Sequence, residues 1–447
     1  MNSNTRKSSF LLFIVGLFGV TEIRVVGNIA ISELVVFIVA PFVFFSDYAQ
    51  LRRDGFLTII SLTFVTMLGC IVSSLCNHTA LPFFIRGFAN IYSIFAFLTV
   101  FHRLLRNNLN GLRWVLLGYA ISSVISIFQF QTGMDANGMV RGQDIGMTAA
   151  EAVENSSLFG VGMINTWMLL PVRGWYFACP SWFSILAPIF CSIVFIFITE
   201  SGRSAALSIV GASVLAFYCR KKQSKMLLIG RHLFQWMLVA CVVVFLAKVG
   251  YSYLAKNGVL GEKQYEKYIR QTRAGTTMLD MLRAGRAEFF IGLTAALDKP
   301  IIGHGPWALD VKGYAAEYML KYALPEDYDQ YLKARAYDPT YINLIPAHSQ
   351  IVGFWVSFGV VGLVLWGYIL YLYCSFFKTS LSAIPQWFGF FAMGVPSSIW
   401  HCFFSPFGAR GSRVLLIACL LIARAVSWGR ITLSREMQIE VAKNDQR

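Results

Sequence analysis

Charged residues are scarce in this 447-residue chain, and acidic residues are the scarcest of them. Charged residues make up 14% of the sequence, with 23 Asp and Glu against 38 Lys and Arg, while 56% of the residues are hydrophobic. An ordinary soluble domain has about 25% charged residues. The composition therefore excludes such a domain, and the apolar residues form runs long enough to cross a bilayer.

The chain also lacks the features of disulfide-stapled or disordered proteins. All nine cysteines lie in or beside apolar runs, where they act as small buried hydrophobes, so no disulfide framework is predicted. There is no internal repeat, low-complexity tract or soluble domain. No cleavable signal peptide separates from the first apolar run, which we expect to be retained as a helix.

The apolar runs predict about twelve membrane-spanning helices, since each span needs roughly 20 apolar residues. Glu22 and Arg24 interrupt the first pair, and 158–172 is short enough to be re-entrant. The fold class is therefore an all-α polytopic membrane protein, with spans placed near 10–26, 29–46, 56–75, 83–101, 112–130, 158–172, 181–199, 203–219, 232–250, 349–374, 386–403 and 411–429.

The basic residues of the short connections alternate from one side of these spans to the other. This pattern predicts that the basic side is cytoplasmic. The formal charge of +15 then reflects topology and anionic lipid, without nucleic acid as a partner. The basic connections are those with Arg6 and Lys7, Arg52 and Arg53, Arg103, Arg106 and Arg113, Arg173, residues 220–225, Lys378, and Arg430, Arg435 and Lys443.

This topology divides the chain into four parts and places the longest connection outside. They are a transmembrane bundle over 1–249, an outer segment over 250–347, transmembrane helices over 348–430 and a cytoplasmic tail over 431–447. Within the outer segment, apolar residues at steps of three and four predict an amphipathic helix over 278–297, with Arg286 in register with the apolar stripe. The stripe consists of Leu279, Leu282, Phe289, Leu293 and Leu297. Pro300 and "GHGPW" end this helix, and two shorter helical stretches flank Pro325.

Two polar residues fall at predicted outer amino termini of spans. Arg203 in "TESGRSAALS" begins one span, and His348 in "AHSQIVGFWVSFGVVG" begins another. Helix amino termini attract anions, phosphate above all. Arg86, Arg141 and Arg410 lie near the same face, where Arg86 and Arg410 are interpreted as interface anchors. His78, His304 and His401 are interpreted as structural histidines.

Taken together, "TESGRSAALS", "RAGRAEFFIGLTAALDKPIIGHGPW" and "AHSQIVGFWVSFGVVG" resemble the bacterial O-antigen ligase and O-antigen polymerase family. The resemblance implies an outer helical subdomain on a fold like that of metal-independent, lipid-phosphosugar (GT-C-type) glycosyltransferases, with no cofactor. It implies that Arg203 and Arg286 bind the diphosphate and that His348 is catalytic, while Arg86, His304 and His401 are secondary candidates. The family typically has Asn where this chain has Ser349, and often Glu where it has Ser357.

The chemistry of these residues agrees with the resemblance. Arginine makes permanently charged, bidentate phosphate contacts and can replace a metal ion in neutralising a diphosphate. Histidine, with an unperturbed pKa of about 6.5, suits general-base work near neutral pH. We therefore expect His348 to accept the proton of the acceptor hydroxyl.

The resemblance implies a multi-pass protein of the bacterial inner membrane with a periplasmic active site. Its donor would be a glycan on undecaprenyl diphosphate, and its acceptor either another glycan, as in a polymerase, or lipid A core, as in a ligase. The departures near His348 favour a polymerase of O-antigen or exopolysaccharide repeat units. Chain-length or export proteins are compatible partners.

Two other classes remain open, a transporter and a metallohydrolase. A transporter of lipid-linked glycan should show charges or broken helices near the bilayer midplane, of which the sequence has no clear set. A metallohydrolase would need a site built from His78, His304, His348 and His401, whose spacings match no metal motif. Asp327, Tyr328 and Asp329 resemble the metal-binding Asp-x-Asp triplet of nucleotide-sugar enzymes. The predicted topology places this triplet outside, whereas nucleotide sugars are cytosolic. A structural assembly subunit would not need the outer arginines and histidine.

Overall fold

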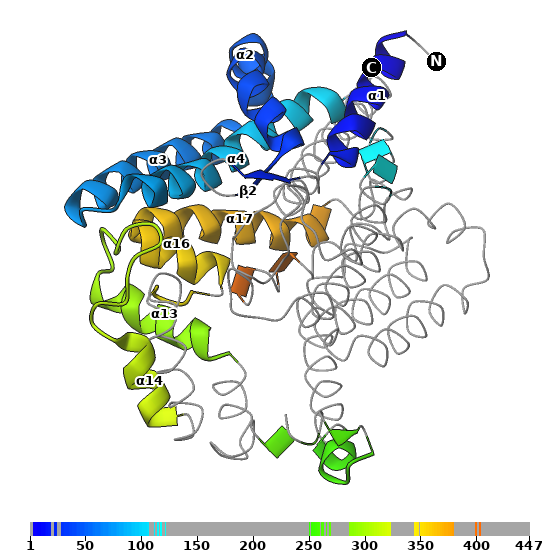
Figure 1. Cartoon of the computed structure of the whole chain (residues 1–447). Helices are drawn as coiled ribbons and strands as arrows, with labels where there is room; N and C mark the ends of the chain where they lie inside the picture. The colour runs from blue at the N-terminus through cyan, green and yellow to red at the C-terminus, as the bar shows by residue number, and fades with distance from the viewer. Residues whose placement is uncertain are drawn as a thin grey trace, which may run out of the picture.

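The computed structural model describes residues 3–18, 22–24, 28–106, 250, 252–259, 286–322, 344–347 and 349–379, with isolated positions between 111 and 121, 261 and 269, and 398 and 403. This part of the chain is mostly helical (Figure 1). Its elements are α1 (Ser3–Leu17), β1 (Glu22–Arg24), β2 (Asn28–Ala30), α2 (Ile31–Arg53), α3 (Leu57–Cys76), α4 (Leu81–Leu105), α13 (Ala287–Asp298), α14 (Tyr314–Tyr322), α16 (Gln350–Phe358) and α17 (Val360–Thr379).

Helices α2, α3 and α4 are long and apolar enough to cross a membrane. They confirm the spans predicted at 29–46, 56–75 and 83–101, each within a few residues except for the extended carboxyl end of α2. Two threonine hydroxyls of α3 are satisfied within the helix: Thr63 Oγ1 donates to the Ile59 carbonyl at 2.7 Å and Thr66 Oγ1 to the Leu62 carbonyl at 2.8 Å. The spans predicted from 112 to 250 and from 386 to 429 lie wholly or largely outside the described residues.

The predicted first span, 10–26, is wrong in its second half. Helix α1 ends at Leu17, and β1 then pairs antiparallel with β2, with Ile23 opposite Ile29. Glu22 and Arg24 alternate with Ile23, which is the period of a strand rather than of a helix. The described part is therefore not purely α-helical, because it contains this short ribbon.

The predicted span 349–374 is broken into α16 and α17. Gly359 separates them with φ +67° and ψ −153°, a conformation open only to glycine. A Cβ atom at this position would collide with the Ile301 carbonyl. Ser349 caps α16, because its hydroxyl accepts a hydrogen bond from the Val352 amide at 3.2 Å.

The predicted amphipathic helix of the outer segment is confirmed in its second half, but the residues that form its buried face differ in part from the predicted stripe. Helix α13 begins after Arg286, which is its N-cap residue and not a member of an apolar stripe. Its buried residues are Ile291, Gly292, Ala295 and Ala296. Phe289 and Leu293 of the predicted stripe pack beside them, whereas Leu297 is 60% exposed. Residues 278–285 lie outside the described part. The predicted helical stretch before Pro325 corresponds to α14, and the stretch after it is not among the described residues.

Helix α14 is fixed to the loop before it by a buried carboxylate. Asp310 is 1% exposed and accepts hydrogen bonds from the backbone amides of Tyr314 and Ala315, both at 2.8 Å. These amides belong to the first turn of the helix and have no partner within it. Asp310 therefore holds the loop around residues 299–313 against the start of α14.

The outer segment lies at one end of the helix bundle. Asn77, just after α3, bonds to Gly303 and Lys299, while the basic residues at the carboxyl ends of α2 and α4 lie at the opposite end (Figure 1). This is the relative placement that the alternation of basic connections predicts.

Candidate functional site

The loop 301–305 is seated in the break between α16 and α17. The His304 amide donates to the Val356 carbonyl at 2.6 Å, and the Gly305 amide donates to the Ser357 carbonyl at 3.2 Å. In return, the Val360 amide donates to the Ile301 carbonyl at 3.2 Å. The last carbonyls of a helix have no partner within it, so the loop satisfies the groups that the break leaves open. "IIGHG" and "WVSFGVVG" therefore form one structural unit.

Side chains at the end of α3 bond to both parts of this unit, the loop 301–305 and the break between α16 and α17. The Asn77 side-chain amide donates to the Gly303 carbonyl at 3.1 Å, and Ser73 Oγ donates to the Ser357 carbonyl at 2.9 Å. Gly303 has φ +77°, and a Cβ there would lie 2.7 Å from the Val356 carbonyl oxygen, so the close approach requires glycine. Residues more than 220 positions apart are joined directly.

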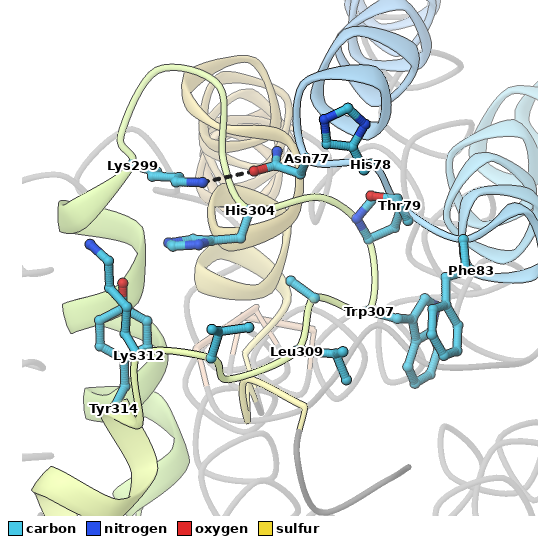
Figure 2. Close-up of a pocket in the computed structure, with 14 residues that line it drawn as sticks. Asn77, His78, Thr79, Phe83, Lys299, His304, Trp307, Leu309, Lys312 and Tyr314 are labelled. Carbon is cyan, nitrogen blue, oxygen red and sulfur yellow. Dashed lines mark hydrogen bonds between the residues drawn. The ribbon is translucent and has the colours of Figure 1, made fainter. Parts of the chain in front are cut away.

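A cavity of about 490 Å³ opens beside this junction (Figure 2). Its volume is within the range typical of small-ligand sites. One wall comes from the connection between α3 and α4 and the first turn of α4, and the other comes from the loop between α13 and α14. The lining residues are Asn77, His78, Thr79, Ala80, Phe83, Lys299, His304, Pro306, Trp307, Ala308, Leu309, Val311, Lys312 and Tyr314.

His304 presents a hydrogen-bond acceptor at this cavity. Its Nε2 lies 2.8 Å from the Ala295 carbonyl, which accepts only, so we assign the ring proton to Nε2 and leave Nδ1 as the acceptor. Burial lowers the pKa of His304, as do the charges of Lys299 and Lys312, and these effects outweigh the bond to Ala295. The imidazole is therefore neutral at pH 7.

The two lysines of the cavity differ in their partners. Lys312 Nζ bonds to both carboxylate oxygens of Asp298 at 2.7 Å, and Tyr314 Oη donates to the same carboxylate at 2.7 Å. These bonds lower the pKa of Asp298. Lys299 Nζ instead donates to the neutral Asn77 Oδ1 at 2.8 Å (Figure 2), and within the described residues no carboxylate pairs with it. Within the described residues, the two lysines therefore differ in that Lys312 has a carboxylate partner and Lys299 a neutral one.

Backbone strain is concentrated at the same cavity. His78 and Trp307, with φ of +50° and +55°, are the non-glycine residues of positive φ in the described part, and both line the cavity. Such a conformation is rare for a bulky side chain and persists only where the surroundings impose it. The Arg86 guanidinium lies 6.0 Å from the ring centroids of both Phe83 and Trp307, at the outer limit of a cation–π contact. Strain and this contact set the position of the Trp307 indole.

The predicted site residues are placed as follows. Arg286 is half-buried at the start of α13, His304 and His78 line the cavity, and Arg86 lies beside it. Predicted residues that lie outside the described part are Arg203, His348, His401, Arg141, Arg410 and the triplet at 327–329.

Helix α13 lies in contact with the residues that precede His348 in the sequence. A Cβ added to Gly292 would lie 3.2 Å from the Pro346 carbonyl and 3.4 Å from the Ala347 Cα, so the two backbones are in close contact. Ser349, on the other side of position 348, is fully buried and donates its hydroxyl proton to the Cys402 carbonyl at 2.9 Å. The helix that follows Arg286 therefore packs against the residues that flank His348.

Sequence reasoning missed Asn77, Lys299 and Trp307. Nothing in the local sequence marks Lys299 as different from other exposed lysines, because its role depends on a distant neutral partner. Trp307 follows "GHGP", and a tryptophan directly after a Gly- and Pro-rich turn was a usable signal. Among the described residues, no group of three or more His, Cys, Asp or Glu could hold a metal ion.

The fold and site define a helical membrane protein with a cavity, lined by both apolar and polar side chains, at one end of its helix bundle. Residues 187–367 match the sequence model of the O-antigen ligase family. The resemblance predicted from the three motifs is therefore confirmed over these residues, which match a domain of that family. No curated protein matches the chain. The matched domain contains the 299–314 wall of the cavity but not the wall at 77–83.

Proposed function

We propose that this protein transfers a glycan from undecaprenyl diphosphate to an acceptor hydroxyl at the outer face of the bacterial inner membrane. Arg203 and Arg286 bind the diphosphate, and His348 is the general base. The observation that carries the proposal is the match to the O-antigen ligase family over 187–367, which contains all three residues. The packing of α13 on Pro346 and Ala347 supports a shared site, because it draws the elements that carry Arg286 and His348 together.

The reaction balances with these residues alone. The acceptor oxygen bonds to the anomeric carbon as the bond from that carbon to the diphosphate breaks, and undecaprenyl diphosphate leaves with the electron pair. His348 takes the proton of the acceptor hydroxyl, and the two arginines stabilise the negative charge that develops on the leaving group. No metal ion is required, because the guanidinium groups supply the positive charge.

The three membrane-capable helices α2 to α4 support a membrane setting for this reaction. In the proposal they are part of a bundle of about twelve spans that resembles GT-C-type enzymes, with the outer segment on the periplasmic side. A lipid-linked donor reaches the site from the bilayer, and the acceptor glycan reaches it from water. Chain-length or export proteins would act beside it.

The acceptor we propose is a second lipid-linked glycan, so that the enzyme is a polymerase of O-antigen or exopolysaccharide repeat units. The remaining argument for this choice is Ser357, which stands where the family often has glutamate. Ser349 no longer contributes, because it is a buried cap and serine caps a helix about as well as asparagine.

A ligase that transfers glycan to lipid A core is the second candidate, since the matched family is described as O-antigen ligase. Purified protein in liposomes, supplied with undecaprenyl-diphosphate repeat units and lipid A core in excess EDTA, separates the possibilities. A ladder of lengthened lipid-linked glycan indicates a polymerase, and glycan on lipid A core indicates a ligase. Activity that chelation abolishes and one divalent ion restores would contradict the arginine mechanism.

A further inference from the structure

We infer that the cavity between residues 77–83 and 299–314 is a remote glycan subsite that binds an acidic sugar, with Lys299 contacting the sugar's carboxylate and Trp307 contacting its ring. The inference rests on the proposed function for the identity of the glycan as substrate, but the binding itself needs no transfer reaction.

The wall of the cavity has the composition that a sugar requires. A sugar ring presents hydroxyl groups at its edge and C–H groups on its faces, so it needs hydrogen-bonding side chains beside an aromatic surface. The cavity supplies the Thr79 hydroxyl and the Nδ1 acceptor of His304, together with the Trp307 indole. A purely apolar ligand would leave these polar groups without partners.

The charge of the cavity points to an acidic sugar rather than a neutral one. Asp298 neutralises Lys312, but Lys299 has only the neutral Asn77 as a partner within the described residues. An ammonium group has three donors, so Lys299 keeps donors for a ligand while Asn77 orients it. A hydrogen bond between charged partners is about twice as strong as a neutral one, so a carboxylate at the rim is favoured.

Strain at His78 and Trp307 indicates that the cavity is preformed. Both residues hold positive φ values, and neither is a glycine that could adopt them without cost. Arg86 lies beside the Trp307 ring, and Gly87 allows Pro306 to pack directly on α4. The indole is therefore held in position before a ligand arrives, which lowers the cost of binding.

The cavity is too far from the proposed reaction to hold the reacting groups. His348 precedes α16 in the sequence, whereas the cavity borders the loop bound at the other end of α16, about 13 Å away for nine helical residues. Arg286 and Lys299 flank the twelve residues of α13, a separation of about 20 Å. A sugar bound in this cavity lies some sugar units along the glycan from the glycosidic bond that is formed. Its binding energy helps to position the reacting groups.

The test measures binding to the full-length protein in nanodiscs without any lipid donor. The probes are trigalacturonate, its trimethyl ester, which keeps the rings but loses the charge, and inorganic diphosphate. We expect trigalacturonate to bind about tenfold more tightly than the ester, with the preference weakened by salt. Equal affinity for the two, or no binding of trigalacturonate, would overturn the inference. Diphosphate that binds more tightly than trigalacturonate at this site would assign it to the donor instead.

Variants locate the binding. Lys299→Gln should remove the preference for the acid, Lys299→Arg should retain it, and Lys321→Gln should leave it unchanged, because Lys321 is an exposed lysine of α14 outside the cavity lining. Trp307→Leu should weaken both sugars equally, and Trp307→Phe should weaken them less. A preference for the acid that survives Lys299→Gln in folded protein contradicts the assignment.

The outcomes separate this inference from the proposed function. If trigalacturonate binds as described but the purified protein transfers no glycan, the subsite stands and the proposed function fails. If transfer is observed and the Lys299 variants bind both sugars like the unmodified protein, the proposed function stands and the subsite fails.

Discussion

The charged side chains at the two ends of the helix bundle differ in their partners. At the end with the basic clusters, the His102 ring lies 2.6 Å from Asp54, and Asp47 pairs with Arg103 at 3.1 Å and with Arg106 at 3.5 Å. At the end with the cavity, Lys312 pairs with Asp298, whereas Lys299 bonds to the neutral Asn77 and has no carboxylate partner among the described residues. The charges at the first end hold helices together, whereas Lys299 at the second keeps donors for a ligand. A count of basic residues alone would not separate these roles.

The difference extends to the backbone. At the end with the basic clusters, the positive φ belongs to a turn glycine, Gly55, whereas the cavity end has a broken helix at Gly359 and two non-glycine residues of positive φ, His78 and Trp307. Strained conformations gather where a structure must present groups in a fixed arrangement. This contrast is the main reason for placing ligand binding at the cavity end.

The largest effect is expected for Gly359→Val. A β-branched residue cannot adopt φ +67° without strain, and its Cβ would collide with the Ile301 carbonyl, so the loop 301–305 must leave the break. We expect little folded protein in the membrane, measured by detergent-extracted yield and thermal midpoint. Gly367→Val is the control, since a Cβ there meets no atom within 4 Å. Equal yields of the two variants would show that the break is not required.

Arg286→Lys should strongly lower glycan transfer without loss of folded protein. Lysine keeps the charge but loses the planar fork that contacts two phosphate oxygens, and we expect at least about 100-fold slower transfer. Arg103→Lys at the opposite end is the matched control, because its exposed side chain pairs only with Asp47 and Ser46 in the described part. Near-normal transfer by the Arg286 variant would show that this residue is an interface anchor and does not bind the diphosphate.

Asp54→Asn should lower stability and leave transfer per folded molecule unchanged. His102 is 1% exposed, and its Nε2 loses a charged partner when the carboxylate becomes an amide. The expected cost is about 1–3 kcal/mol, seen as a lower thermal midpoint. Loss of transfer at unchanged stability would contradict the view that this end is structural.

The smallest effect concerns the pH dependence of sugar binding. Burial lowers the pKa of His304 below its usual 6.5, so the ring stays neutral from pH 6.5 to 8 and its Nδ1 can accept a hydroxyl proton in a hydrogen bond. Binding of the trimethyl ester should be constant over that range and weaken only as the pH falls below it. His304→Ala should remove this acid-side loss. A decline centred above pH 6.5 would mean that the ring is not held neutral.

The sequence predicted those parts of the fold that depend on local pattern. Helices α2 to α4 follow from apolar runs separated by polar connections, and the end at which α13 lies follows from the alternation of basic residues. The break at Gly359 could not be predicted, because "FGVVG" is apolar throughout and the partner that stabilises the break, Ile301, is distant in the sequence. Apolar periodicity also misplaced Arg286, which ends up as the N-cap of α13.

The candidate site was predictable only where a motif carries it. "GHGPW" and "AHSQIVGFWVSFGVVG" identified the loop and the helix that form the junction. Lys299 bonds to the neutral side chain of Asn77, 222 positions away, and no spacing rule relates the two residues. The roles of Arg203, Arg286 and His348 stay predictions.

The most direct test of the central claim is single-turnover transfer by His348→Gln, with donor binding and protein yield measured on the same preparation. Glutamine can hydrogen-bond an acceptor hydroxyl but cannot take its proton at a useful pH. The account predicts normal yield, nearly unchanged binding of the lipid-diphosphate donor and transfer slowed about 100-fold or more. Near-normal transfer by well-folded His348→Gln protein would contradict it, and His304 and His401 would then be the next candidates for the base.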